Sequence, residues 1–171
     1  MSEHMQNYYG SLCTEMYEIR EIRPEEYPLL DDFLYEAIYI PENVEAPPRD
    51  IIEQPDLQVY VADFGKKDDN ALVAVQDETV VGVVWSRIMK DYGHVDDQIP
   101  SLAIALFKEY RGQGIGTALM RQMLLLLREK GYEKVSLSVQ KANYAVKMYK
   151  AVGFRVLEDR EEEYIMVCDL V

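Results

Sequence analysis

The sequence has little of what disulfide-linked, metal-binding and membrane-spanning proteins need. It contains only 2 cysteines and 2 histidines, and Cys13 and Cys168 do not form a C-x-x-C motif. We therefore predict two free thiols, a reducing cytoplasmic location and no bound metal. No apolar run approaches the ~20 residues that span a bilayer. Residues 1–20 also lack the basic start and apolar centre of a signal peptide, so we expect no membrane partner.

Positive charge is also scarce. The 18 Lys and Arg residues against 31 Asp and Glu give a net charge of -13. A general nucleic-acid binder is normally basic, so this balance argues against nucleic acid as a partner. The charge is uneven, however, because residues 101–155 carry 10 basic and 3 acidic side chains, a local net charge of +7. This basic segment predicts one local anionic ligand, and the acidic remainder would suit a cationic second partner.

The pattern of apolar residues predicts a single mixed α/β (α+β) domain over residues 16–171, after a loose tail over residues 1–15. The expected element order is β-α-α-β-β-β-α-β-α-β-β. Residues 57–62, LQVYVA, fit either short helical pieces or a strand. The expected strands cover residues 15–23, 71–75, 79–89, 101–107, 134–139, 154–158 and 162–170, and the main helices cover 24–40, 114–130 and 143–152.

A glycine-rich turn stands between the buried strand over 101–107 and the helix that follows. In the segment EYRGQGIGTALMRQ, Arg111 precedes Gly112, Gly114 and Gly116. Glycines let the backbone approach a phosphate, and the first N–H groups of a helix are unpaired and partially positive. No lysine follows Gly116, which excludes a P-loop. Thr117 stands where a dinucleotide-binding loop requires its last glycine or alanine.

Two segments together carry a family resemblance. Residues 111–116 fit [RQ]-x-x-G-x-[GA], and NYAVKMYKAVGF over residues 143–154 fits N-x-x-A-x-x-x-Y-x-x-x-G-F. With the expected element order across residues 16–170, the sequence resembles the GCN5-related N-acetyltransferase (GNAT) superfamily. The resemblance implies transfer of an acetyl group from acetyl-CoA to a primary amine. Because Cys13 lies in the expected tail and Cys168 in the last strand, we expect direct transfer in a ternary complex rather than an acetyl-cysteine intermediate. It also implies that the fourth and fifth strands splay apart to hold CoA, and that the chain forms a homodimer.

The same resemblance assigns the donor site. The fourth strand would contact the pantetheine arm, the glycine-rich turn would wrap the pyrophosphate, and the facing helix would contribute Asn143. Tyr149 matches the family's general acid, whose phenol donates a hydrogen bond or proton to the leaving thiolate. Lys147 and Lys150 either lie near the CoA phosphates or are solvated. The implied cofactor-binding residues are Ile104, Ala105, Leu106, Arg111, Gly112, Gln113, Gly114, Ile115, Gly116, Thr117 and Asn143.

The acceptor is a small-molecule or peptide amine, and its site has no motif of its own. We expect it to be lined by Tyr35, Glu36, Tyr39, Trp85 and Arg87. Many relatives carry a glutamate base on the fourth strand, but residues 100–107, PSLAIALF, contain no acid. Water or the side chains of Glu36, His94, Asp96 or Asp97 remain candidate bases. The alternative function is a non-catalytic acyl-CoA-binding sensor or interaction module on the same fold.

Overall fold

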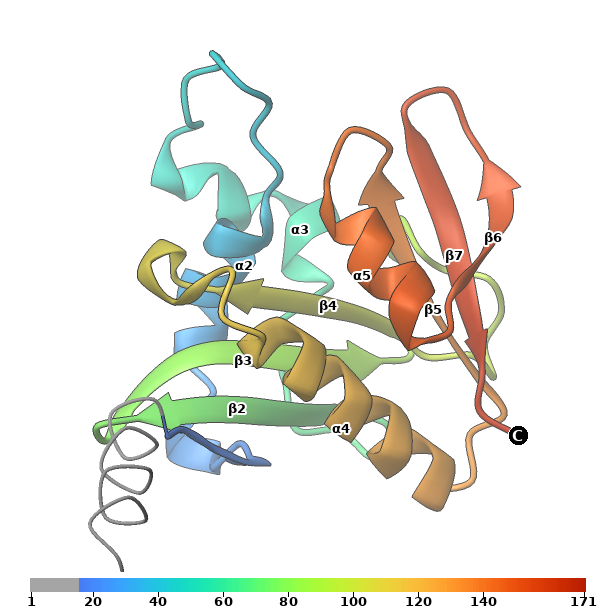
Figure 1. The fold of residues 1–171 in the computed structure, drawn as a ribbon, viewed down its shortest axis with the longest axis horizontal. Helices are drawn as coiled ribbons and strands as arrows, with labels where there is room; N and C mark the ends of the chain where they lie inside the picture. The colour runs from blue at the N-terminus through green and yellow to red at the C-terminus, as the bar shows by residue number, and fades with distance from the viewer. Residues whose placement is uncertain (1–15) are drawn as a thin grey trace, which may run out of the picture.

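A seven-stranded sheet forms the centre of the computed structural model, which describes residues 16–171 (Figure 1). The tail expected over residues 1–15, with Cys13, lies outside the described residues. The strand order is β1-β2-β3-β4-β5-β7-β6, and only the β4–β5 pair is parallel. The strands are β1 (Glu18–Glu21), β2 (Asn70–Gln76), β3 (Thr79–Arg87), β4 (Ser101–Leu106), β5 (Lys134–Gln140), β6 (Arg155–Asp159) and β7 (Glu163–Asp169).

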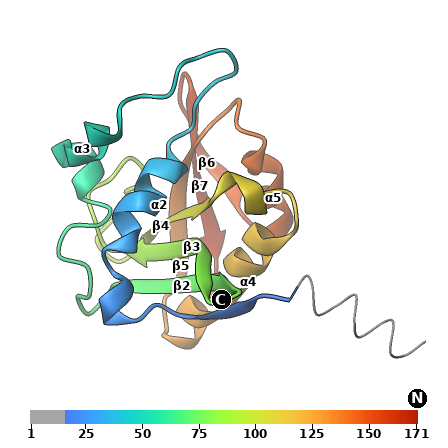
Figure 2. The same cartoon turned by 90° about the vertical axis from the view of Figure 1, so that its left-hand side faces the viewer.

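Helices cover both faces of this sheet (Figure 2). On one face lie α2 (Leu29–Ala37), the short helix η2 (Arg49–Glu53) and α3 (Pro55–Gln58); α4 (Ile115–Glu129) and α5 (Ala145–Val152) lie on the other. Two further short helices are η1 (Pro24–Glu26) and η3 (Lys108–Tyr110). The expected mixed α/β fold is confirmed. Residues 57–62 form the end of α3 and a turn rather than a strand.

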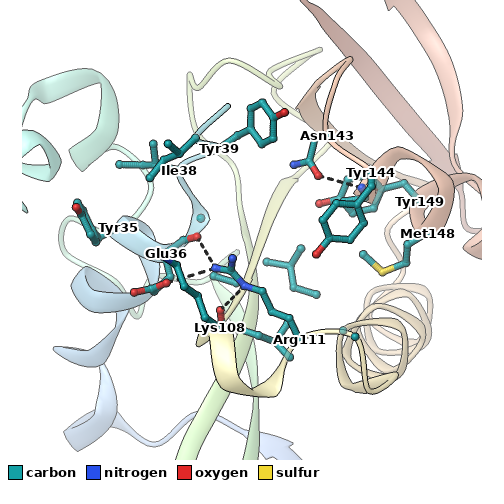
Figure 3. A pocket seen from close by; sticks show the side chains of 18 of the residues that line it. Tyr35, Glu36, Ile38, Tyr39, Lys108, Arg111, Asn143, Tyr144, Met148 and Tyr149 are labelled. Atoms are coloured by element: carbon teal, nitrogen blue, oxygen red, sulfur yellow. Dashed lines mark hydrogen bonds and ion pairs between the residues drawn. The ribbon is translucent and has the colours of Figure 1, made fainter. Parts of the chain in front are cut away.

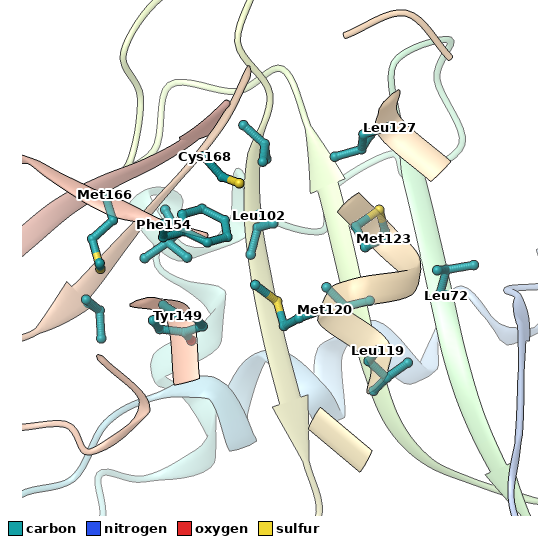
Figure 4. Close-up of a cluster of buried hydrophobic side chains, with 14 of the residues drawn as sticks. Leu72, Leu102, Leu119, Met120, Met123, Leu127, Tyr149, Phe154, Met166 and Cys168 are labelled. Carbon is teal, nitrogen blue, oxygen red and sulfur yellow. The ribbon is translucent and has the colours of Figure 1, made fainter. Parts of the chain in front are cut away.

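Each face of the sheet buries its own hydrophobic core. Between α2 and the sheet, the buried residues include Leu30 and Phe33 of α2 and Trp85 of β3. Beneath α4, the side chains of Leu119 and Met123 project onto the sheet from the same face of the helix (Figure 4). Because both faces are covered, the central strands are apolar on both sides, and the sheet provides a rigid base for the segments at its edge.

The parallel pair β4–β5 separates almost as soon as it forms. Its register contains one pair, Ser101 opposite Ser136, and Ser136 N donates to Pro100 O at 2.9 Å. Beyond this point β4 pairs only with β3, and β5 pairs along its whole length with β7. The two strands therefore diverge from a common start (Figure 1). The splay expected between the fourth and fifth strands is confirmed.

Candidate active site

A cavity of about 780 Å³ opens where β4 and β5 diverge (Figure 3). We call it the first cavity. One side is formed by the end of α2 and the loop after it, the floor by β4 and the glycine-rich turn, and the other side by the start of α5. Its lining includes Tyr35, Glu36, Tyr39, Ile104, Ala105, Leu106, Lys108, Arg111, Gly112, Gly114, Gly116, Thr117, Asn143, Tyr144, Met148 and Tyr149.

The glycine-rich turn presents bare backbone to this cavity. Gly112 and Gly114 have φ values of 73° and 85°, a left-handed conformation that favours glycine. A Cβ atom added at either residue would meet no atom within 4 Å. Gly114 caps the N-terminus of α4, and no side chain caps this end of the helix. The first amides of α4 are therefore free to bind an anion.

Two of the expected turn residues do not line the cavity. Ile115 is 2% exposed and packs in the core beneath α4. Gln113 is exposed, and its side-chain nitrogen donates to Glu109 O at 3.0 Å. Their side chains stabilise the turn, so any ligand contact from them would involve the backbone alone.

Arg111 ties the turn to the opposite side of the cavity. Its Nε donates to Leu106 O at 3.0 Å, and its Nη2 lies 3.2 Å from Glu36 O and 3.3 Å from Glu36 Oε2 (Figure 3). Lys108 is the other basic residue that lines the cavity. Two cations and one carboxylate thus surround the open amides of the turn, which suits a polyanionic ligand.

Tyr149 of α5 lies where the chemistry would take place. Its side chain packs edge to face on Phe154, with ring centroids 6.0 Å apart, and 8% of the residue is exposed. Its hydroxyl has no hydrogen-bond partner among residues 16–171. Burial raises the pKa of Tyr149 to about 12. The phenol is therefore protonated at neutral pH and able to donate to a ligand in the cavity.

The start of α5 contributes a polar side chain to the first cavity, whereas two lysines of this helix lie outside it. Asn143 Oδ1 accepts a hydrogen bond from Ala145 N at 2.9 Å, which leaves the side-chain nitrogen of Asn143 facing the cavity (Figure 3). Lys147 and Lys150 are exposed, and neither lines the cavity. This favours the solvated interpretation of both lysines.

A second cavity, of about 270 Å³, adjoins the first. Tyr149, Ile104, Asn143 and Tyr39 line both of them. The remaining wall is contributed by segments far apart in the sequence, and it includes Leu57, Tyr60, Tyr92, Leu102, Leu137, Ser138, Gln140 and Glu163. Glu163 is the only lining residue with a formal charge. No motif marks these residues, because the fold alone brings them together.

Comparison with known proteins now identifies the fold family. The family model described as "Acetyltransferase (GNAT) family" matches residues 16–154. The chain belongs to the GNAT acetyltransferase family. The resemblance inferred from residues 111–116 and 143–154 is thus confirmed.

Curated relatives of this GNAT chain are named as N-acetyltransferases. A probable N-acetyltransferase camello of Xenopus laevis is 35% identical over 86 residues, which cover 48% of this chain and 37% of the relative. An N-alpha-acetyltransferase of Sulfurisphaera tokodaii is 32% identical over 114 residues, which cover 57% of this chain and 68% of the relative. The aligned region thus spans little more than a third of the Xenopus protein.

Solved structures share the fold at low sequence identity. The ribosomal-protein-S18-alanine N-acetyltransferase of Escherichia coli superposes with a TM-score of 0.65 at 17% identity, covering 91% of this chain and 94% of that one. A PaiA N-acetyltransferase of Thermoplasma acidophilum, solved in complex with coenzyme A, gives 0.64 at 22% identity, covering 90% and 99%. At such identities the likeness concerns the GNAT fold.

Two expected acceptor residues lie in the core instead of the GNAT cleft. Trp85 is fully buried, and its Nε1 donates to Tyr60 O at 2.9 Å. Arg87 is 4% exposed, forms two 3.1 Å hydrogen bonds to Asp69 and also donates to the carbonyls of Val59 and Ala62. Neither lines a cavity. Their expected contact with an acceptor is corrected: both fasten the segment after α3 to β3.

The candidate bases are dispersed. Glu36 lines the first cavity, paired with Arg111. His94 Nδ1 lies 2.9 Å from Met89 O and its Nε2 lies 3.5 Å from the exposed Asp97, while Asp96 accepts a hydrogen bond from Gln98 N. These last three candidates line neither cavity.

Within residues 16–171, no helix is long and apolar enough to cross a membrane. The same residues contain no group of three or more His, Cys, Asp or Glu side chains placed to hold a metal ion.

Proposed function

We propose that this GNAT chain transfers an acetyl group from acetyl-CoA to a primary amine, by direct attack within a ternary complex. The observation that carries the proposal is the place of Tyr149, whose side chain lines both adjoining cavities. The first cavity has the features of an anion site and would hold the donor. The second has an acidic wall and would hold the acceptor. Tyr149, as a proton donor where the two cavities meet, would face the thioester of the bound acetyl-CoA.

The donor fits the first cavity in both charge and hydrogen bonding. The pyrophosphate would lie on the amides behind Gly112 and Gly114, beside Lys108. The pantetheine arm would follow the edge of β4 at Ile104 and Leu106, which β5 leaves unpaired. Buried backbone groups need partners, and an amide-containing chain can supply them as an added strand would. The coenzyme A complex of the Thermoplasma relative is consistent with this donor.

The chemistry requires one nucleophile and one proton donor. A neutral amine attacks the thioester carbonyl, the C–S bond breaks, and the electron pair remains on the CoA sulfur. The Tyr149 phenol donates to that sulfur as negative charge develops. Cys168 is 5% exposed in β7 and lines neither cavity. Its place favours direct transfer over an acetyl-cysteine intermediate.

The second cavity favours a cationic acceptor. Its only charged lining residue is Glu163, and tyrosines 39, 60, 92 and 149 supply aromatic and hydroxyl groups. An ammonium group is attracted by both the carboxylate and the ring faces. The names of the relatives point to amines of several sizes, from protein N-termini to spermidine. The shared chemistry is a primary amine.

Turnover against defined amines tests this proposal. The panel comprises propylamine, tyramine, 1,4-diaminobutane and a short peptide with a free N-terminal alanine, each supplied with acetyl-CoA. We expect thiol release that depends on the amine, together with an acetylated product seen by mass spectrometry. The protein with alanine at both cysteines should retain this turnover. Tight acetyl-CoA binding without turnover on any amine would contradict the proposal and indicate a sensor.

A further inference from the structure

Asp91 is a partly buried carboxylate beside the second cavity, and the proposed transfer gives it no role yet. It lies in the loop between β3 and β4, where Ser101 Oγ donates to its Oδ1 at 2.7 Å. The Gly93 backbone lies close enough to lower the pKa of this carboxyl. The Tyr60 hydroxyl lies next to the Asp91 carboxylate and to Ser138. Tyr60 and Ser138 line the second cavity, so Tyr60 stands between Asp91 and the space for the acceptor.

The environment of Asp91 is poor in compensating positive charge. Tyr60, Ser101 and Ser138 are neutral, and Lys and Arg are absent from the cavity lining. The nearby Tyr92 hydroxyl donates a hydrogen bond to Asp56. The negative charge of Glu163 also contributes to the raised pKa of Tyr92. His94 on the same loop is held by Met89 O and Asp97. Asp91 is thus a carboxylate flanked by the hydroxyl groups of Ser101 and Tyr60.

Protonation behaviour follows from this setting. Burial raises the pKa of Asp91, with hydrogen bonds from Ser101, Gly93 and Tyr60 acting against the rise. Burial and the negative charge of Asp91 raise the pKa of Tyr60 above its ordinary value. Tyr60 therefore remains a neutral phenol, which can accept a proton on its oxygen while it gives its own to Asp91. Asp91 is made more basic than an exposed carboxylate.

We propose that Asp91 is the terminal acceptor of the proton that the substrate ammonium must lose, and that the Tyr60 hydroxyl relays it. The inference rests on the proposed function and deepens it. It supplies the base that β4 lacks, from the loop directly before that strand. Asp91 acts through Tyr60 and does not touch the substrate, so it is a positioning and proton-accepting residue.

The protons balance over one cycle. The ammonium N–H bond breaks, its proton moves to the Tyr60 oxygen, and the Tyr60 proton moves to Asp91, which becomes a neutral acid. The free amine then forms the C–N bond and the C–S bond breaks. The remaining excess proton on nitrogen is lost to solvent, while the CoA sulfur receives a proton from Tyr149, which is reprotonated from solvent. Asp91 releases its proton to water before the next cycle.

The test compares two amines of similar shape and different basicity. The probes are the most active amine of the panel and its analogue with two fluorines on the carbon beside the amino-bearing carbon. The assay is run at about pH 8.5, where the fluorinated amine is mostly neutral and needs no base, while the parent amine is mostly protonated. Asp91→Asn conserves the shape of the side chain, and Tyr60→Phe removes the relay. Asp77→Asn is the matched control, because Asp77 is an exposed aspartate in the turn between β2 and β3 and lines neither cavity.

We expect Asp91→Asn and Tyr60→Phe to lower kcat about a hundredfold with the basic amine, the usual contribution of a general base. With the fluorinated amine the loss should be less than about fivefold, since the proton step is absent. In Asp91→Asn only the amine that is already neutral in solution can react. With the basic amine, log(kcat/KM) of this variant should therefore rise with pH up to the pKa of the amine. Asp91→Glu should restore part of the activity, and Asp77→Asn should behave as wild type.

Equal losses with both amines, at an unchanged acetyl-CoA affinity, would overturn the proposal and leave Asp91 as a support of the loop. Unchanged activity of Asp91→Asn would overturn it as well. These outcomes differ from failure of the proposed function, in which the wild-type protein transfers to no amine. Thermal unfolding of each variant separates loss of fold from loss of the relay.

Discussion

Arg111 and Glu36 join the two sides of the first cavity. Arg111 Nη2 lies 3.3 Å from Glu36 Oε2 and 3.2 Å from the Glu36 carbonyl oxygen, so the glycine-rich turn is fastened to the end of α2. The side chains are 37% and 21% exposed. The carboxylate neutralises a cation that a pyrophosphate would otherwise attract. Donor binding therefore competes with this ion pair.

Replacing Glu36 by Gln should tighten acetyl-CoA binding. The amide can still bond Arg111, but the competing negative charge is gone. Partly exposed ion pairs contribute up to about 1 kcal/mol, so we expect the Kd to fall by about two- to fivefold. Titration calorimetry at two salt concentrations measures this. Glu53→Gln, an equal charge change at an exposed residue of η2, is the control. A weaker affinity for Glu36→Gln would show that the pair organises the site.

Gly114 and Gly131 form a natural comparison at the two ends of α4. Their φ values are 85° and 91°, and an added Cβ would meet nothing within 4 Å at either. Alanine should therefore cost each about 1 kcal/mol of stability. Only Gly114→Ala should also weaken acetyl-CoA binding, by about tenfold or more, because its Cβ would occupy the phosphate's place. Equal affinities of the two variants would place the phosphate elsewhere.

Arg87 should affect stability without affecting the acceptor. Arg87→Met leaves the buried Asp69 carboxylate without its cation, and we expect a loss of about 3–5 kcal/mol in the free energy of unfolding. Urea denaturation measures the loss, with Arg128→Met on the exposed side of α4 as control. At a temperature where the variant is folded, KM for the amine should be unchanged. A raised KM with normal stability would return Arg87 to the acceptor site.

The high pKa of Tyr149 sets the alkaline side of the pH profile. A phenol with a pKa of about 12 stays protonated below that pH, where an ordinary tyrosine with a pKa near 10 would already ionise. With saturating amine, kcat should therefore show no decline between about pH 8 and 10.5. Stability falls above about pH 10, since tyrosines of the unfolded chain ionise first. A decline in kcat near pH 9 in the folded protein would contradict this account.

The glycine-rich turn of the first cavity could be recognised in the sequence because local patterns encode its conformation. The positive φ values at Gly112 and Gly114 favour glycine at these two positions. The glycines therefore recur at a fixed spacing, which can be recognised as a motif in the sequence. The helix over residues 143–152 was also expected, and Tyr149 is its buried residue, but the role expected of Tyr149 came from the family resemblance. The divergence of β4 from β5 could be expected only through the family resemblance, since no single residue demands it.

The lining of the second cavity could not be predicted in the same way. Tyr60, Tyr92, Asp91 and Glu163 come from loops and strand ends that meet only in the folded chain. Trp85 was misplaced because β3 is buried on both faces, so an aromatic residue on it faces α2 and not a cleft. The indole N–H of Trp85 donates to the Tyr60 carbonyl, so Trp85 holds the segment after α3 against β3.

The central claim, that Tyr149 donates to the leaving thiolate, is tested most directly by Tyr149→Phe with acetyl-CoA and the best amine of the panel. Its hydroxyl lacks a hydrogen-bond partner among the described residues, so its removal should barely change stability. We predict a fall in kcat of about a hundredfold, with the Kd of acetyl-CoA unchanged. Tyr27→Phe, which removes the same atom from a tyrosine packed on Phe64 away from both cavities, should leave kcat unchanged. An unchanged kcat for Tyr149→Phe would contradict the account.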